Sequence, residues 1–243
     1  MKKYQRRGII RKKTEAGPGI FRMSIELPFE ENEIKPGQFL FLKPFDGIAP
    51  LLRRPFGIAS AEDGLLDIIF DVKGGGTLEL SKRAEGDELD VIYPLGRGFP
   101  LHDGKKPVLV AGGMGIAPLL FLADYLKNKG IEYAFYYGAA TSSKLVYAEA
   151  ACGGASGSGL YTDDGSSGKK GLVTDALAPD SSEVYYCCGP TPMMKAAAKE
   201  VIKAGVECYV SLEENMACGV GVCMGCTVDL KPAKDGTRRT ARI

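Results

Sequence analysis

The sequence has a single histidine, no tryptophan and no long apolar run. With His102 alone, the chain excludes metal sites that need several imidazole ligands. The longest uncharged stretch, residues 107–123, is 17 residues long and contains three glycines and two prolines. A membrane-spanning helix needs roughly 20 mostly apolar residues. The basic N-terminal residues lead into no apolar signal segment, so we expect no membrane span and a cytoplasmic location.

An excess of charge of either sign is also missing, because 31 basic and 30 acidic residues leave a formal net charge of +1. No overall field would recruit nucleic acid or an anionic membrane surface, so we expect neither as a partner. The hydrophobic fraction of 45% and the charged fraction of 25% are those of an ordinary globular protein. A chain of 243 residues forms one large domain or two compact ones.

Two kinds of sequence pattern divide the chain. In the first part, short β-type runs alternate with Gly and Pro, which predicts an N-terminal antiparallel β-barrel over residues 1–100. Apolar runs then alternate with helical stretches, which predicts a Rossmann-like parallel α/β domain over residues 101–212. Within it, the Gly- and Ser-rich residues 153–171 predict a loop. A cysteine-bearing loop and a polar tail occupy residues 213–243.

A glycine-rich turn follows the first apolar run of the second half and opens a predicted helix. Backbone N–H groups and the positive end of the helix dipole favour a phosphate there, and the missing Cβ atoms let the backbone approach it. The third glycine of the dinucleotide fingerprint is replaced by Pro118, and no acidic residue ends the second strand. A tight turn without a ligand is the alternative interpretation. The candidate residues are Gly112, Gly113, Gly115, Ile116, Ala117 and Pro118.

A second loop contains Cys188, Gly189 and Pro190, again between a predicted strand and a predicted helix. The carboxyl ends of parallel strands share one edge of a sheet, where ligands bind, so we expect this loop beside the glycine-rich turn. A small, polarisable thiol there suits a planar ring. The alternative is a pair of buried thiols, Cys187 and Cys188.

In the first half, Arg54, Pro55 and Phe56 open a β-type run. Arginine binds phosphate through two parallel hydrogen bonds, and a phenylalanine ring offers an apolar face. Further on, Gly76 is the last of three consecutive glycines, and Thr77 follows it at the start of a short predicted helix. Gly76 and Thr77 form a second candidate phosphate site. A charged strand edge and a flexible turn are the alternative interpretation.

Three cysteines, Cys218, Cys223 and Cys226, follow a C-x4-C-x2-C spacing with glycines between them. Plant-type 2Fe-2S sites use this spacing and a distant fourth cysteine, and the glycines allow backbone N–H groups to point at the sulfur atoms. No cysteine follows Cys226. Three structural thiols or a zinc site are the alternatives, although structural zinc normally has four protein ligands. The odd total of seven cysteines argues against a disulfide framework.

In this order, and over essentially the whole chain, these motifs resemble the electron-transfer subunit of NAD-dependent dihydroorotate dehydrogenase, within the ferredoxin-reductase-like flavoproteins. The resemblance implies an FAD-binding barrel, an NAD-binding α/β domain and a C-terminal loop that carries a 2Fe-2S cluster. The FAD-binding residues that it implies are Arg54, Pro55, Phe56, Gly57, Ile69, Phe70, Asp71, Gly76 and Thr77. The implied NAD-binding residues are those of the glycine-rich turn together with Cys188, Gly189 and Pro190, and the implied cluster ligands are Cys218, Cys223 and Cys226.

Two positions depart from the family's pattern. Gly57 stands where the family has a serine, so a hydroxyl near the reactive edge of the flavin is missing. Ala241 stands in the place of the fourth cysteine. The alternatives for the cluster are a fourth ligand of another kind, a labile cluster, or no cluster.

The resemblance further implies a partner, a catalytic dihydroorotate dehydrogenase subunit that carries FMN, in a heterotetramer. Electrons then run from dihydroorotate through FMN, the cluster and FAD to NAD, in pyrimidine biosynthesis. The chain shows no acid–base pair or nucleophile, so we expect an oxidoreductase subunit without catalytic residues of its own. NAD is favoured over NADP because the second strand ends at residues 138–140 without an arginine, and because Asp163 and Asp164 would repel a 2′-phosphate. NADP stays open as the alternative, because Lys144, Lys169 and Lys170 could bind that phosphate.

Two other functions stay open. An NAD(P)H:ferredoxin-type reductase is the first, although Glu213, Glu214 and Asn215 lead into the cysteine loop as in the dihydroorotate dehydrogenase family. The second is an adaptor or regulatory protein that has lost the cluster, for which Gly57 and Ala241 are the evidence. Visible absorbance separates this adaptor from the other two, because a chain that holds neither flavin nor iron is colourless.

Overall fold

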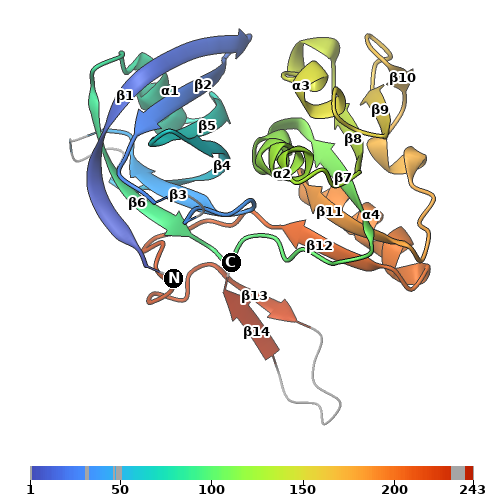
Figure 1. Cartoon of the computed structure of the whole chain (residues 1–243). Helices are drawn as coiled ribbons and strands as arrows, with labels where there is room; N and C mark the ends of the chain where they lie inside the picture. Colours follow the sequence, from blue (N-terminus) through green and yellow to red (C-terminus); the bar gives the residue numbers. More distant parts are fainter. Residues whose placement is uncertain (1, 31–32, 46, 48–50, 231–238, 243) are drawn as a thin grey trace.

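The computed structural model describes residues 2–30, 33–45, 47, 51–230 and 239–242. Six strands of the first half close into a barrel, and the second half forms a six-stranded sheet flanked by helices (Figure 1). The fold class predicted from the sequence, an antiparallel barrel followed by a parallel α/β unit, is therefore confirmed. In the described part of the chain, no helix is long and apolar enough to cross a membrane.

Neighbouring strands of the barrel are antiparallel, in the order β1-β2-β5-β4-β3-β6. Side chains alternate between the two faces of a strand, so Leu40 and Leu42 of β3 both enter the barrel core. Helix α1 follows β5 and adds Leu80 to the same core. The elements are β1 (Tyr4–Gly17), β2 (Ile20–Glu26), β3 (Phe39–Lys43), β4 (Arg54–Glu62), β5 (Leu65–Asp71), α1 (Gly75–Lys82) and β6 (Glu88–Leu95).

The second sheet is parallel throughout, in the order β10-β9-β8-β7-β11-β12. The sequence order reverses between β7 and β11, and crevices at such reversals are where ligands bind in open α/β sheets. Its strands are β7 (Lys106–Gly112), β8 (Ala134–Ala139), β9 (Gly157–Thr162), β10 (Lys169–Lys170), β11 (Glu183–Cys188) and β12 (Glu207–Ser211). Its helices are η1 (Gly113–Gly115), α2 (Ile116–Asn128), η2 (Ser142–Lys144), α3 (Ala148–Cys152), η3 (Val173–Ala176) and α4 (Thr191–Lys203).

The expectation of a loop over residues 153–171 is wrong. Strands β9 and β10 lie in this segment, and β9 pairs with β8 along its whole length. The glycines that suggested a loop are packed, because a Cβ at Gly159 would lie 2.9 Å from the ring of Tyr161 and 3.1 Å from that of Tyr136. Pairing with β8 and contact with these rings override the low strand propensity of glycine.

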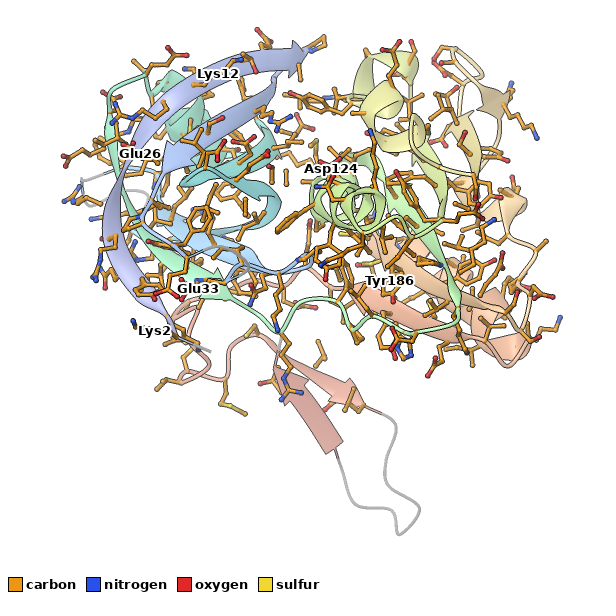
Figure 2. All side chains as sticks on the ribbon, in the orientation of Figure 1. Lys2, Lys12, Glu26, Glu33, Asp124 and Tyr186 are labelled. Atoms are coloured by element: carbon orange, nitrogen blue, oxygen red, sulfur yellow. The ribbon has the colours of Figure 1, made fainter. Side chains whose placement is uncertain are left out.

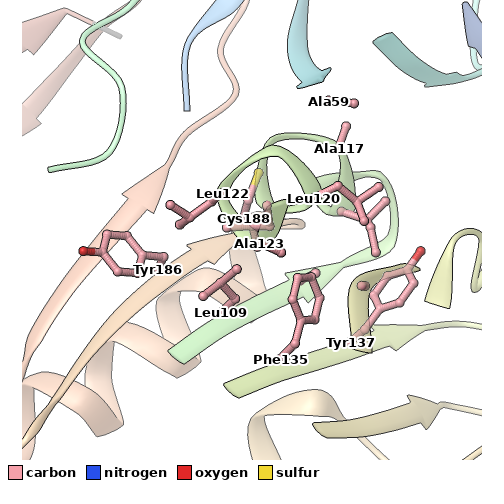
Figure 3. Close-up of a cluster of buried hydrophobic side chains, with 14 of the residues drawn as sticks. Ala59, Leu109, Ala117, Leu120, Leu122, Ala123, Phe135, Tyr137, Tyr186 and Cys188 are labelled. Carbon is pink, nitrogen blue, oxygen red and sulfur yellow. The ribbon is translucent and has the colours of Figure 1, made fainter. Parts of the chain in front are cut away.

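The two halves meet where α2 packs on β4. A Cβ at Gly57 of β4 would lie 3.2 Å from the ring of Pro118 of α2, and Figure 3 shows Ala59 beside Ala117. Phe121, about one turn further along α2, belongs to the barrel core. A continuous apolar interface therefore holds the barrel and the sheet together.

The linker between the two halves is also fixed by packing. Tyr186 of β11, labelled in Figure 2, donates a hydrogen bond to the carbonyl oxygen of Pro100 at 2.7 Å. Its ring packs edge-on against Phe99 and stacks on Tyr209, whose hydroxyl lies 2.7 Å from Nε2 of His102. The single histidine of the chain therefore belongs to the packing of the linker.

The chain after β12 forms the cysteine loop, residues 213–226, and then a two-stranded antiparallel hairpin. The hairpin consists of β13 (Thr227–Leu230) and β14 (Arg239–Arg242), and its backbone register pairs Val228 with Ala241. Figure 1 shows the hairpin extending away from both halves.

Candidate cofactor sites

A cavity of about 500 Å³ opens at the carboxyl ends of the parallel strands, where the sequence order of the sheet reverses. Its walls come from the ends of β7 and β8, from the segment after β9, from the loop after β11 and from the first turns of α4. The barrel contributes the end of β5, so the cavity lies between the two halves. The lining includes Asp71, Gly112, Gly113, Met114, Gly138, Ala139, Lys144, Asp163, Thr174, Pro190 and Met193.

The glycine-rich turn and the Cys188-Gly189-Pro190 loop touch each other at the back of this cavity. A Cβ at Gly115 would lie 2.1 Å from the carbonyl oxygen of Cys188, and one at Gly189 would lie 2.9 Å from the backbone of Gly112. No side chain fits at either contact. Glycine is required here because the two loops approach each other through their backbones.

The predicted NAD-binding residues divide into two groups. Gly112, Gly113 and Pro190 line the cavity, whereas the other residues of the turn lie beneath them at the buried start of α2. Cys188 is 2% exposed and lies in the core beneath α2 (Figure 3). Burial raises the pKa of its thiol to about 12, so the side chain stays neutral. The thiol that was expected to face a planar ring is therefore placed in the core.

One charged pair crosses the cavity from the barrel to the sheet. Nζ of Lys144, in η2, lies 3.3 Å from both carboxylate oxygens of Asp71, at the end of β5. The aspartate, expected to contact a flavin, is thus bound to the other half of the molecule. Lys144 was not among the predicted site residues, because nothing in its local sequence links it to a residue 73 positions earlier.

The predicted phosphate-binding residues of the barrel come together at the start of α1. Arg54 packs on Gly76, where an added Cβ would lie 2.8 Å from Nε of the arginine. Oγ1 of Thr77 accepts hydrogen bonds from the backbone N–H groups of Lys73 and Gly74, at 2.9 and 3.2 Å. No atom of the described residues lies within 4 Å of a Cβ built on Gly74. A guanidinium group beside an open helix N-terminus fits the pyrophosphate of a dinucleotide such as FAD.

The aromatic residues of the expected flavin site point into the barrel instead. Phe56 and Phe70 are buried in the barrel core, with ring centroids 5.8 Å apart. Only their backbones are therefore open to a ligand on the outer face. Gly57 lies against Pro118, and a serine there would press on the proline ring. The expected flavin strand thus runs directly beside the start of α2.

The cysteine loop holds its sulfur atoms by backbone hydrogen bonds. The N–H of Cys223 donates to Sγ of Cys218, and the N–H of Gly225 donates to Sγ of Cys223, both at 3.4 Å. Backbone N–H groups, that of Cys223 foremost and that of Val220 next, lower the pKa of Cys218 to about 6 and favour its thiolate. Cys226 is 6% exposed.

The fit of this loop to an iron–sulfur cluster rests on donor chemistry. Three thiols, of which Cys218 and Cys223 accept hydrogen bonds from backbone amides, match three of the four ligand positions of a 2Fe-2S site. Among the residues that the structure describes, no three thiol, imidazole or carboxylate groups lie close enough together to hold one metal ion. A 2Fe-2S cluster would divide its ligands between two irons, so its four ligands need not gather around one metal ion. In the hairpin, the backbone of Ala241 pairs with that of Val228, which comes two residues after Cys226. Residue 241 therefore lies on the strand next to the one that follows Cys226.

An antiparallel barrel with a candidate phosphate site, joined to a parallel sheet with a glycine-lined cavity, is typical of the ferredoxin-reductase-like class of oxidoreductases. A family model described as an oxidoreductase NAD-binding domain matches residues 109–199. A second, described as the iron-sulfur cluster binding domain of dihydroorotate dehydrogenase B, matches residues 213–241.

Curated relatives define the family further. The electron transfer subunit of dihydroorotate dehydrogenase B (NAD(+)) from Clostridium acetobutylicum is 40% identical over 92% of this chain and 87% of its own length. A homologue of that subunit from Aquifex aeolicus is 38% identical over 88% of this chain and 86% of its own length. The chain therefore belongs to the family of dihydroorotate dehydrogenase B electron transfer subunits.

A solved structure of an NADH-dependent reduced ferredoxin-NADP oxidoreductase, described in relation to flavin-based electron bifurcation, is also similar. It superposes with a TM-score of 0.81 and is 32% identical, over 90% of this chain and 81% of that one. The similarity spans both the barrel and the sheet.

The contact between Gly115 and Cys188 generates a prediction for coenzyme binding. Gly115→Ala should raise the dissociation constant for NADH about tenfold or more, equivalent to about 1.4 kcal/mol, because the new methyl group forces the two loops apart. Isothermal titration calorimetry measures the affinity. Gly157→Ala is the control, because its Cβ would meet only an ordinary contact, 3.9 Å from Ala134. An unchanged affinity in Gly115→Ala would show that the loops do not shape the coenzyme site.

Proposed function

We propose that this chain carries electrons between NAD(H) and a dihydroorotate dehydrogenase catalytic subunit, through FAD on the barrel and a 2Fe-2S cluster in the cysteine loop. One observation carries the proposal. The strand expected to hold the flavin and the turn expected to hold the dinucleotide touch at Gly57 and Pro118. A flavin on β4 and a nicotinamide at the carboxyl end of β7 would then be neighbours.

Electron counting supports this order of cofactors. NADH delivers two electrons as a hydride, whereas a 2Fe-2S cluster carries one electron at a time. When bound, FAD supplies the chemistry that joins the two, since a flavin exchanges electrons singly or in pairs. The chain itself contributes binding and orientation and no catalytic residue.

The residues divide these tasks by position. Arg54, Gly76 and Thr77 hold the pyrophosphate of FAD, and Gly112 and Gly113 hold that of NAD. Asp163, which lines the same cavity, disfavours a 2′-phosphate by repulsion, and this supports NAD over NADP.

The partner in this proposal is an FMN-bearing catalytic subunit that oxidises dihydroorotate to orotate, with both chains present in a heterotetramer. The names of the curated relatives imply such a separate subunit. Apolar side chains are exposed on the cysteine loop: Val220 is 41%, Val222 80% and Met224 50% exposed. Such residues are typical of a protein–protein interface, so we place the docking surface there.

A ferredoxin is the second candidate partner, and the 32% identity to the ferredoxin-NADP oxidoreductase favours it. The match of residues 213–241 to the cluster domain of dihydroorotate dehydrogenase B favours the first. Electron transfer assays with each partner separate the two.

A visible spectrum, with iron and acid-labile sulfide analysis of anaerobically purified protein, tests the proposed function. We expect flavin absorbance that NADH bleaches, together with iron and acid-labile sulfide in equal amounts, at no more than about two irons per chain. Flavin absorbance without iron would mean that the chain accepts electrons from NADH but lacks the cluster that passes them to a partner. A colourless chain would contradict the proposal and favour an adaptor.

The position of Ala241 predicts how the cluster can be strengthened. Ala241→Cys should raise the iron and sulfide content toward about two irons per chain and slow the loss of the cluster in air, because it supplies the missing fourth thiolate. Thr240→Cys, which adds a thiol at the adjacent position, is the control. Equal iron content in the unchanged protein and in Ala241→Cys would mean that another ligand already completes the site.

The exposed loop predicts an effect on assembly. Met224→Asp should weaken binding of the catalytic subunit about tenfold or more, because a charge would be buried against the partner, while the FAD content stays the same. Ile202→Asp on α4, where the isoleucine is 63% exposed, is the matched control. Calorimetric titration with the catalytic subunit measures both affinities, and an unaltered affinity in Met224→Asp would place the docking surface elsewhere.

A further inference from the structure

Phe41 is a buried phenylalanine on the outer face of the barrel. Its neighbours in β3, Leu40 and Leu42, both belong to the barrel core. Because side chains alternate along a strand, Phe41 points away from that core, yet it is 0% exposed. Another part of the chain must therefore cover its ring.

The cysteine loop provides that cover. A Cβ at Gly219 would lie 2.3 Å from Cδ1 and 2.7 Å from Cε1 of Phe41, so the backbone of Gly219 rests on the ring itself. The φ angle of Gly219 is +68°, which a residue with a side chain adopts only with strain. Gly219 directly follows Cys218, the first cysteine of the loop. Figure 1 shows the chain crossing back to the barrel between β12 and β13.

The same phenylalanine is tied to the strand expected to hold the flavin. In the antiparallel pairing of β3 with β4, Phe41 lies opposite Pro55, and Leu42 lies opposite Arg54. Phe41 thus contacts the cysteine loop through its ring and pairs with β4 through its backbone. Phe41 therefore connects Gly219, the residue after the first cysteine, with Pro55 of the predicted flavin motif.

We propose that Phe41 is a positioning residue that sets the distance and orientation of the cysteine loop relative to the flavin strand. The inference rests on the proposed function, because it assumes that electrons pass between these two sites. A loop rich in glycine has little stiffness of its own, and a functional site is held in place by packing on a rigid element. The ring of Phe41, locked in β3, supplies this support, and Gly219 has no side chain because the backbone must reach the ring.

Two variants disturb the contact from opposite sides. Phe41→Ala removes the ring, and Gly219→Ala forces the loop off it. Gly205→Ala is the control for backbone strain, because Gly205 has a φ angle of +72° and nothing within 4 Å of its Cβ position. The full chain, loaded with FAD, iron and sulfide, is compared in every case.

Two measurements report on the contact. Hydrogen–deuterium exchange of residues 213–226 reports on the loop independently of activity, and we expect it to quicken about tenfold in both variants, since the loop loses its support. Rapid kinetics separates flavin reduction by NADH from the later transfer to the cluster, which EPR detects. We expect the first rate to be unchanged and the second to fall severalfold, because the rate of electron transfer drops steeply as the distance between two redox groups grows.

The outcomes are distinguishable. Slower transfer and faster loop exchange in Phe41→Ala or Gly219→Ala, with Gly205→Ala resembling the unchanged protein, support the inference. Unchanged exchange and transfer in both variants, or equal slowing in Gly205→Ala, would overturn it. If NADH fails to reduce the flavin of the unchanged protein, the proposed function fails instead, while the exchange data still decide whether Phe41 holds the loop.

Discussion

The close contact between α2 and β4 is the constraint on which the other features of this protein depend. Pro118 lies at the start of α2, where the glycine-rich turn ends, and it packs against Gly57, the last residue of the expected flavin motif on β4. Ala59, Ala117 and Phe121 continue the contact into both cores. Small residues permit this approach, because larger ones would separate the helix from the strand. The two candidate dinucleotide sites are neighbours for that reason.

Backbone approaches through glycine recur at each candidate site. Gly115 meets the carbonyl of Cys188 behind the cavity, Gly76 lies under Arg54 at the phosphate site, and Gly219 rests on Phe41 beside the first cysteine. In each pair, a glycine packs closely against an atom of a segment that is distant in the sequence. The sites are thus joined to the fold by contacts that tolerate no Cβ, and this makes their geometry rigid even though their loops are rich in glycine.

Much of the fold was predictable because it depends on local patterns. Short β-type runs predicted the barrel, and strands alternating with helices predicted the parallel sheet, since side-chain periodicity is a property of neighbouring residues. The loop expected over residues 153–171 was wrong, because β8 supplies β9 with pairing that glycine and serine do not specify themselves. The charged strand β1 gave no such signal, because much of its length faces water.

The sequence by itself determined which residue types are available: glycines at the candidate phosphate sites, Arg54 at the start of a β-type run, three cysteines at cluster spacing, and alanine at position 241. Only the tertiary structure decided which of them meet. It turned the ring of Phe56 into the barrel, paired Asp71 with Lys144 across the cavity, and placed Gly219 on Phe41. These outcomes depend on contacts between residues far apart in the sequence. Such contacts are set by how the strands and α2 pack, and no local spacing encodes that packing.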